Sequence, residues 1–296
     1  MERFEFNSHD GKRISVVEWN DVLNPKGVIQ ISHGMAEHAL RYDKIAKYLN
    51  GQGFIVFADD HRAHGGTDAL THGYCDGDIF EDTLKDMALL TEHYKNKYGL
   101  PIVLFGHSYG SFLSQCYVQR YSALISGAVI GGSSNMGVAL PTAGNFVAWL
   151  ACMFGMAKKP ANLIKKITFD VYDKQFDYGT FISSIKEECD IYAADPDCGF
   201  VCSYNFYRRF FKGLRTSVKK KSLAALNKDL PLLLIAGKDD PVSEKCKGVD
   251  KLEAMYLKLG VSVEKVTYDG VRHEYLNDTS REQAFEKIAE FANRVI

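Results

Sequence analysis

A sharp turn between an apolar run and a helical pattern is the feature that most constrains this chain. The run Ile102–Phe105 has the composition of a fully buried strand, and apolar residues recur at helical spacing from Phe112 onward. Between them, Gly106-His107-Ser108-Tyr109-Gly110 matches the pattern G-x-S-x-G. In such a turn a strained backbone lifts the serine hydroxyl clear, and small residues two positions away relieve the crowding. The stretch therefore predicts a strand, a nucleophile at Ser108 and a helix.

Alternating strand and helix patterns surround this turn. Further apolar runs predict strands at 28–31, 54–58, 127–132, 230–236 and 261–268, with helices at 79–98, 245–259 and 281–295 between or after them. This alternation predicts an α/β fold with a mostly parallel, doubly wound sheet. Residues 3–19 alternate around Asp10-Gly11, which predicts an N-terminal antiparallel hairpin. Right-handed crossovers place the carboxyl ends of the parallel strands at one edge, where ligands bind.

The alternation stops between residues 133 and 225, where only helical pieces and turns are expected. We therefore expect a core formed by 1–132 and 226–296, with 133–225 inserted as a helical cap over the active edge. No charged residue occurs from Tyr121 to Ala157, which also raises the alternative of a transmembrane helix. Pro141, Gly144 and the position of the run between two α/β segments favour a buried strand followed by an apolar lid.

A serine nucleophile needs a base, and the base needs a carboxylate that orients it. With an elbow of this kind the chain order is serine, acid, histidine, and among nine histidines only His273 follows Ser108. It comes directly after the last predicted strand. The preceding strand ends at Asp239-Asp240-Pro241, and Pro241 biases Asp240 toward an extended backbone. We expect Asp240 to be the acid and Asp239 its solvated neighbour.

An oxyanion hole needs two backbone donors near the nucleophile. The first is expected to be the N–H of Tyr109, the residue after Ser108, and the second the N–H of Met35 in the loop after strand 28–31. His33 and Glu37 are expected to brace that loop rather than to transfer protons. His107 is expected to pack or hydrogen-bond beside the elbow.

Composition narrows the class of protein. The net charge is −1, so nothing indicates a nucleic-acid partner. The first residues lack the apolar core of a signal peptide, and seven cysteines is an odd number, so we expect reduced thiols and a cytoplasmic location. Cys198 and Cys202 lack a second ligand pair, so we expect no metal and no cofactor.

The predicted cap has two chemically different parts. Phe146, Trp149 and Met153 lie in its apolar first part, and we expect them to line an acyl pocket, while apolar residues of this part could also meet a lipid surface. Over 133–225 there are thirteen Lys or Arg and eight Asp or Glu, a balance of about +5 that argues against a carboxylate site for a substrate ammonium. The run Lys219–Lys221 is either a solvated surface or a contact for an anionic head group.

Five segments resemble monoacylglycerol lipases and bacterial lysophospholipase-like hydrolases. They are His33-Gly-Met-Ala-Glu-His38 with Arg41-Tyr42, Asp60-His-Arg-Ala-His64-Gly65, Gly106-His-Ser-Tyr-Gly110, Gly237-Lys-Asp-Asp240 and His273. The resemblance covers 1–132 and 226–296 and implies the α/β-hydrolase fold, the triad Ser108, Asp240 and His273, and oxyanion donors at Met35 and Tyr109. The lipases usually carry a smaller residue where this chain has Met35, which implies a narrower pocket mouth.

The implied activity is hydrolysis of a carboxylic ester through an acyl-enzyme. The expected substrate is a monoacyl lipid, either a monoacylglycerol or a lysophospholipid, or a similar small ester, with transient contact between the cap and a membrane surface. An aminopeptidase or amidase on the same fold is the alternative. A non-catalytic binding protein is a third reading, but such proteins normally lose part of the triad, and every part is present here. Nothing in the sequence determines the oligomeric state.

Overall fold

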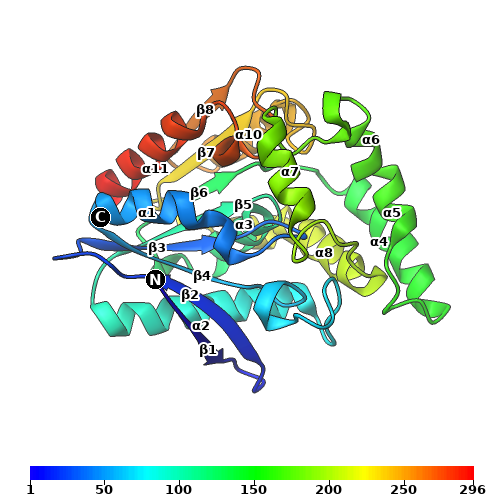
Figure 1. Ribbon diagram of the computed structural model, residues 1–296, viewed down its shortest axis with the longest axis horizontal. Helices are drawn as coiled ribbons and strands as arrows, with labels where there is room; N and C mark the ends of the chain where they lie inside the picture. The colour runs from blue at the N-terminus through cyan, green and yellow to red at the C-terminus, as the bar shows by residue number, and fades with distance from the viewer.

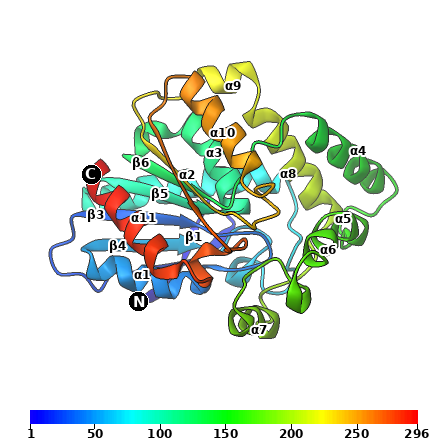
Figure 2. The same ribbon diagram turned by 90° about the horizontal axis from the view of Figure 1, so that it is seen from above.

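The computed structural model describes all 296 residues and contains one eight-stranded sheet with helices on both faces (Figures 1 and 2). In spatial order the strands are β1 (Glu2–Asn7), β2 (Arg13–Trp19), β4 (Phe54–Asp59), β3 (Gly27–Ser32), β5 (Ile102–His107), β6 (Gly127–Gly131), β7 (Leu232–Gly237) and β8 (Val263–Tyr268). β1 and β2 form an antiparallel hairpin, β2 is antiparallel to β4, and all other neighbours are parallel. The predicted α/β fold with its N-terminal hairpin is therefore confirmed.

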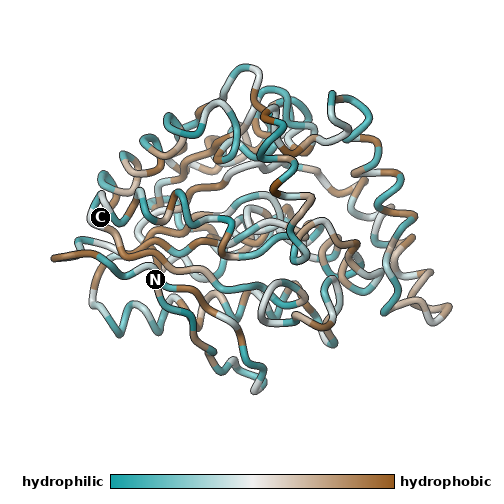
Figure 3. Tube along the Cα trace, in the orientation of Figure 1, coloured by the Kyte–Doolittle hydropathy of each residue, from teal (hydrophilic) through white to brown (hydrophobic).

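The central strands are apolar because both of their faces are covered. Along β5, Ile102 and Leu104 join one hydrophobic cluster, whereas Val103 and Phe105 join a second cluster across the sheet. Figure 3 shows hydrophobic residues running along these central strands. The period of two thus assigns alternate residues of one uninterrupted apolar run to opposite faces.

Five helices complete the core. Two pack on one face, α1 (Asp43–Gly51) and α11 (Arg281–Val295), and three on the other, α2 (Ile79–Tyr98), α3 (Tyr109–Arg120) and α10 (Lys247–Lys258). α2 and α11 span the predicted residues. α10 begins later than expected because Glu244, Lys245 and Cys246 all have a positive φ, which excludes them from a right-handed helix.

Six helices lie between β6 and β7 and form what we call the helical insertion. They are α4 (Ala139–Met153), α5 (Asn162–Ile167), α6 (Phe169–Asp173), α7 (Lys186–Ala194), α8 (Tyr204–Ser217) and α9 (Lys220–Ala224). Figures 1 and 2 show α4 to α8 beyond one edge of the sheet, with α4 packed against α8. No helix in the structure combines the length and apolar character needed to cross a bilayer.

Candidate active site

Ser108 stands at the turn between β5 and α3 with φ 52° and ψ −119°, a left-handed backbone that is rare for a residue with a side chain. The turn is tight because other backbone segments approach it closely. A Cβ on Gly110 would lie 1.9 Å from the carbonyl oxygen of Ser32, and a Cβ on Gly106 would lie 2.5 Å from the carbonyl oxygen of Gly110. These contacts give the physical reason for both glycines of the motif.

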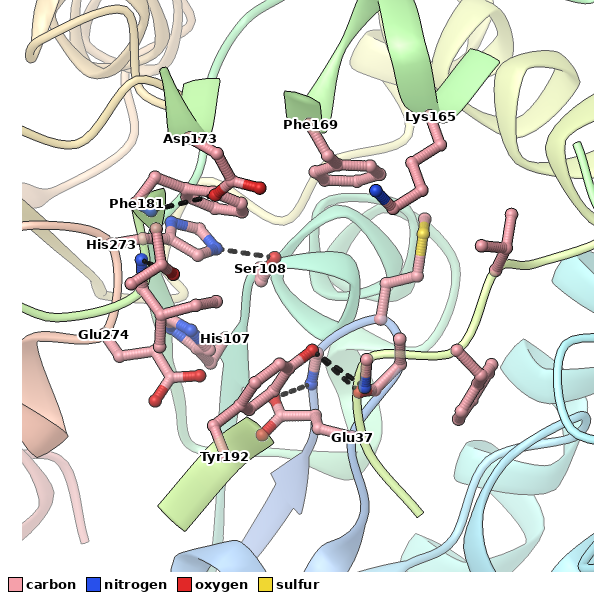
Figure 4. Close-up of a pocket in the computed structure, with 18 of the residues that line it drawn as sticks. Glu37, His107, Ser108, Lys165, Phe169, Asp173, Phe181, Tyr192, His273 and Glu274 are labelled. Carbon is pink, nitrogen blue, oxygen red and sulfur yellow. Dashed lines mark hydrogen bonds between the residues drawn. The ribbon is translucent and has the colours of Figure 1, made fainter. Parts of the chain in front are cut away.

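The loops after β7 and β8 bring two further side chains to Ser108. His273 Nε2 lies 2.8 Å from Ser108 Oγ, and His273 Nδ1 lies 2.9 Å from Asp240 Oδ1 (Figure 4 shows the first contact). Asp240 is fully buried, and its Oδ1 also accepts a hydrogen bond of 2.8 Å from the N–H of Val242. Asp239 is only half-buried, and the hydrogen bond of His273 Nδ1 is made to Asp240 instead. The structure thus joins the three residues expected from the sequence into one hydrogen-bonded chain.

The surroundings of His273 favour its protonated form. Burial by itself lowers its pKa, but the charge of Asp240 and their hydrogen bond outweigh burial, so the pKa of His273 lies above its usual value. The ring of His107 lies 4.9 Å away, and burial together with the charge of His273 lowers the pKa of His107 to about 3. His107 is therefore neutral at physiological pH and adds no positive charge beside the imidazolium that would form at His273.

Two backbone N–H groups beside Ser108 have no protein acceptor, those of Met35 and Tyr109. The loop that carries Met35 is braced by Glu37, which accepts hydrogen bonds from the N–H of Gly34, the hydroxyl of Tyr42 and the guanidinium of Arg41. The expected bracing role of Glu37 is confirmed. A negative oxygen bound at Ser108 would find two free donors already in place.

An apolar cavity of about 210 Å³ opens from Ser108 beneath the helical insertion. Fifteen of its eighteen lining residues are hydrophobic. Residues of five helices form its walls: Tyr109 and Phe112 from α3, Leu140, Ala143, Gly144 and Val147 from α4, Ile164 and Ile167 from α5, Phe169 and Tyr172 from α6, and Tyr207, Phe210 and Phe211 from α8. Such a cavity can bury methylene groups at about 0.8 kcal/mol each.

The expectation that Phe146, Trp149 and Met153 line this cavity is wrong. None of them lies in its wall, and their exposed fractions are 59%, 38% and 67%. They occupy the face of α4 opposite to Leu140 and Val147, which do line it. Because α4 carries no charged residue, its sequence does not mark which face turns inward.

A second, more polar cavity of about 160 Å³ meets the first at Ser108. Figure 4 shows its lining, which includes charged residues of the core and of the insertion: Glu37 and Glu274 from the core, and Lys165 and Asp173 from the insertion. The positive balance of residues 133–225 argued against a carboxylate site for a substrate ammonium, yet one carboxylate of the insertion, Asp173, lines this cavity. The net charge of a whole segment does not show where a single acid lies in the fold.

One group of potential metal ligands lies outside both cavities. Ligand atoms of His38, Asp195 and Cys198 all lie within 4.8 Å of one another. His38 Nε2 and Asp195 Oδ2 are already hydrogen-bonded at 2.9 Å, and burial raises the pKa of the Cys198 thiol well above its usual value. The hydrogen bond between His38 and Asp195 therefore joins the insertion to the loop of Met35.

A family model described as serine aminopeptidase, S33, matches residues 23–280. The chain belongs to this family. Its similarity to named lipases identifies the chain more narrowly as a hydrolase of the carboxylesterase or lipase type, on the monoacylglycerol lipase-like branch.

Two lipases and one carboxyl esterase show how far this similarity extends. Human monoglyceride lipase is 28% identical over 268 residues, which is 89% of this chain and 80% of that protein. The monoacylglycerol lipase of Mycolicibacterium smegmatis is 26% identical and covers 94% of this chain and 92% of its own. A thermostable carboxyl esterase from Bacillus coagulans, solved in complex with glycerol, has a TM-score of 0.89 at 25% identity and covers 99% of this chain and 98% of its own.

Proposed function

We propose that this protein hydrolyses carboxylic esters of monoacyl lipids through an acyl-enzyme on Ser108. The observation that carries the proposal is the position of Ser108 at the junction of an apolar and a polar cavity, with His273 hydrogen-bonded behind it. An acyl chain fits the first cavity and a polar alcohol the second. The similarity to monoglyceride and monoacylglycerol lipases supports the same substrate class.

The proposed reaction begins when Ser108 Oγ attacks the ester carbonyl while His273 Nε2 takes the hydroxyl proton. Asp240 stabilises the imidazolium, and the N–H groups of Met35 and Tyr109 stabilise the oxyanion. His273 then gives the proton to the departing alcohol. A water molecule, deprotonated by His273, attacks the acyl-enzyme, releases the carboxylic acid and restores Ser108.

We further propose that the helical insertion is a cap over residues 1–132 and 226–296 and that it touches lipid surfaces. The outward face of α4 exposes Phe146, Trp149, Leu150 and Met153, and Phe154, directly after the helix, is 77% exposed. A contiguous apolar face of this kind favours contact with a membrane. Replacing Phe146 and Met153 by Ser should lower co-sedimentation with phosphatidylcholine vesicles, and unchanged co-sedimentation would contradict this part of the proposal.

Aminopeptidase or amidase activity is the second candidate. It is favoured by Asp173, a carboxylate of the insertion that lines the polar cavity and could hold a substrate ammonium. Ester hydrolysis fits better because the larger cavity beside Ser108 is apolar, and an acyl group that carries an ammonium would be poorly solvated there.

The test is kcat/KM on p-nitrophenyl esters with acyl chains of two to twelve carbons, beside alanine and proline arylamides. We expect kcat/KM to rise from acetate to about eight carbons, by up to roughly threefold to fourfold for each methylene buried in the transition state. Val147→Phe should shorten the optimal chain, whereas Phe146→Ser, on the outer face of the same helix, should leave it unchanged. A profile highest at acetate, or efficient arylamide cleavage, would overturn the proposal.

A further inference from the structure

The lining of the polar cavity is rich in carboxylates, whereas the helical insertion as a whole has more basic than acidic residues. Two of the carboxylates that line the cavity, Glu37 and Glu274, share one cation. Arg41 Nη1 lies 2.6 Å from an oxygen of each, and its Nη2 lies 2.7 Å from the second oxygen of Glu274. Arg41 therefore neutralises only one of these two charges.

The charges that line the cavity from the insertion are Lys165 and Asp173. Lys165 is hydrogen-bonded to Asp170, so its charge is already compensated. Asp173 forms no ion pair: one of its oxygens accepts a hydrogen bond of 3.1 Å from the N–H of Phe181, and the other is free. Figure 4 shows Asp173 and Lys165 on opposite sides of the ring of Phe169.

Three carboxylates, Glu37, Asp173 and Glu274, and one lysine, Lys165, line the polar cavity. Arg41 adds one cation behind Glu37 and Glu274, so the carboxylates that line the cavity still outnumber these cations. Burial raises the pKa of Asp173, although the hydrogen bond from Phe181 and the charge of Lys165 oppose this rise. An anion in this cavity would be repelled, and a cation would replace the missing partner.

Aromatic rings beside Asp173 suit a cation as well. The rings of Phe169 and Phe181 are stacked with centroids 5.8 Å apart and an interplanar angle of 17°, and both line the cavity. Phe181 also lies 5.4 Å from the ring of His273, so this aromatic wall adjoins the reacting centre. An ammonium at Asp173 would lie near aromatic faces, which attract cations.

We propose, as a refinement that rests on the proposed function, that Asp173 makes the polar cavity select leaving alcohols by charge. Alcohols that carry an ammonium group are accepted best, neutral polyols next, and alcohols that carry a phosphate are rejected. Asp173 is therefore a specificity-determining residue. The bond that is broken remains the ester bond at Ser108, and no further chemistry is required.

The experiment compares kcat/KM for three decanoyl esters below their micellar concentrations: those of choline, of glycerol and of glycerol 3-phosphate. In the wild-type protein we expect the choline ester to exceed the glycerol ester by roughly threefold to tenfold, and the phosphate ester to fall at least about tenfold below it. Asp173→Asn should lower the ratio of choline to glycerol ester about fivefold to tenfold and raise the relative rate of the phosphate ester. The amide oxygen of Asn can still accept the hydrogen bond from Phe181.

Asp177→Asn is the matched control because it removes the same charge from an exposed position four residues along the insertion. We expect the kcat/KM values of Asp177→Asn for the three esters to equal those of the wild type.

The ratio of kcat/KM between two esters of the same variant cancels a general loss of activity or of folded protein. Ratios in Asp173→Asn within twofold of the wild type, or equal rates for the glycerol and phosphate esters in the wild type, would overturn the inference. If p-nitrophenyl octanoate is still hydrolysed and Ser108 still reacts with a fluorophosphonate, only this refinement fails; if neither occurs, the proposed function itself fails.

Discussion

The hydrogen-bonded chain that begins at Ser108 has a counterpart inside the core. There, Ser32 Oγ lies 2.8 Å from His61 Nε2, and His61 Nδ1 lies 2.7 Å from Asp59 Oδ2. These two distances differ from those of the Ser108 chain by no more than 0.2 Å. We call this second set the buried chain, because all three of its residues have exposed fractions of 0 to 1%.

The two chains differ in backbone conformation and access. Ser108 has a positive φ and lines two cavities, whereas Ser32 ends the regular strand β3 and lines neither of them. The buried chain instead supports the loop of Met35: His61 N–H donates to His33 Nε2, and the rings of His33 and His61 stack at 4.1 Å. Only the Ser108 chain combines a strained elbow, an adjoining cavity and free backbone donors. We therefore expect the Ser108 chain to be reactive and the buried chain to be structural.

The largest expected difference between the chains is in activity. Ser108→Ala should lower kcat for p-nitrophenyl octanoate by on the order of 10⁴-fold or more and abolish labelling by a fluorophosphonate. Ser32→Ala should retain labelling, and its kcat should fall less than about tenfold because Ser32 lines neither of the two cavities beside Ser108. Intact mass after labelling and steady-state rates measure both. Labelling that survives in Ser108→Ala would show that the nucleophile is another residue.

The acid of the Ser108 chain should give the next largest effect. Asp240→Asn should lower kcat by about 10³-fold to 10⁴-fold because His273 loses the anion that orients it, while Asp239→Asn should cost under about tenfold. The hydrogen bond and charge of Asp240 also raise the pKa of His273, which must be neutral to act as a base. The acidic limb of kcat/KM should therefore lie above pH 6.5 in the wild type and move to lower pH in Asp240→Asn. A larger loss of kcat in Asp239→Asn than in Asp240→Asn would show that Asp239 is the residue that orients His273.

Lowering the pH should destabilise the folded protein through His33, whose ring stacks on His61 of the buried chain. Burial and the neighbouring charge of His61 lower the pKa of His33 to about 4, against about 6.5 in the unfolded chain. Between these values only the unfolded chain binds this proton, so the free energy of unfolding should fall as the pH drops from about 6.5 to about 4, by about 3 kcal/mol from His33. The raised pKa of His273 acts in the opposite sense, because its stabilisation is complete at low pH and is lost as the pH rises through its folded pKa.

Urea unfolding between pH 4 and pH 8 measures this slope. His33→Gln removes the titrating group, so its free energy of unfolding should vary less with pH than that of the wild type, whatever its absolute stability. Identical slopes for the two proteins would show that His33 does not carry the acid sensitivity.

The smallest expected effect is on stability. Here the replacement of Ser32 should cost more than that of Ser108, which is the reverse of the order expected for activity. Ser32→Ala leaves a buried nitrogen of His61 without a partner, which should cost about 1–3 kcal/mol of stability. Ser108→Ala removes a hydroxyl that faces two cavities and should change the free energy of unfolding by less than about 0.5 kcal/mol. Urea unfolding at pH 8 compares them. A larger loss for Ser108→Ala would mean that the Ser108 chain, and not the buried chain, stabilises the fold.

Local patterns in the sequence account for much of this structure. The apolar run at β5, the glycines around Ser108 and the periodicity of α2 predict their elements because each depends on residues close in the chain. Chain order and the common edge of parallel strands then lead to Asp240 and His273, which the structure brings to Ser108. Their catalytic roles stay predictions until the variants above are measured.

Tertiary packing decided what these patterns leave open. α4 is uncharged around its whole circumference, so its packing against α8 sets the inward face, and Phe146 points outward as a result. Arg41 and Glu274 are 233 positions apart, and only the folded chain pairs them. The sequence by itself determined the sheet, the elbow and the order of the reacting groups, because periodicity and chain order are local properties. The charge of the polar cavity and the buried chain were decided by folding, because they depend on side chains from distant segments meeting in space.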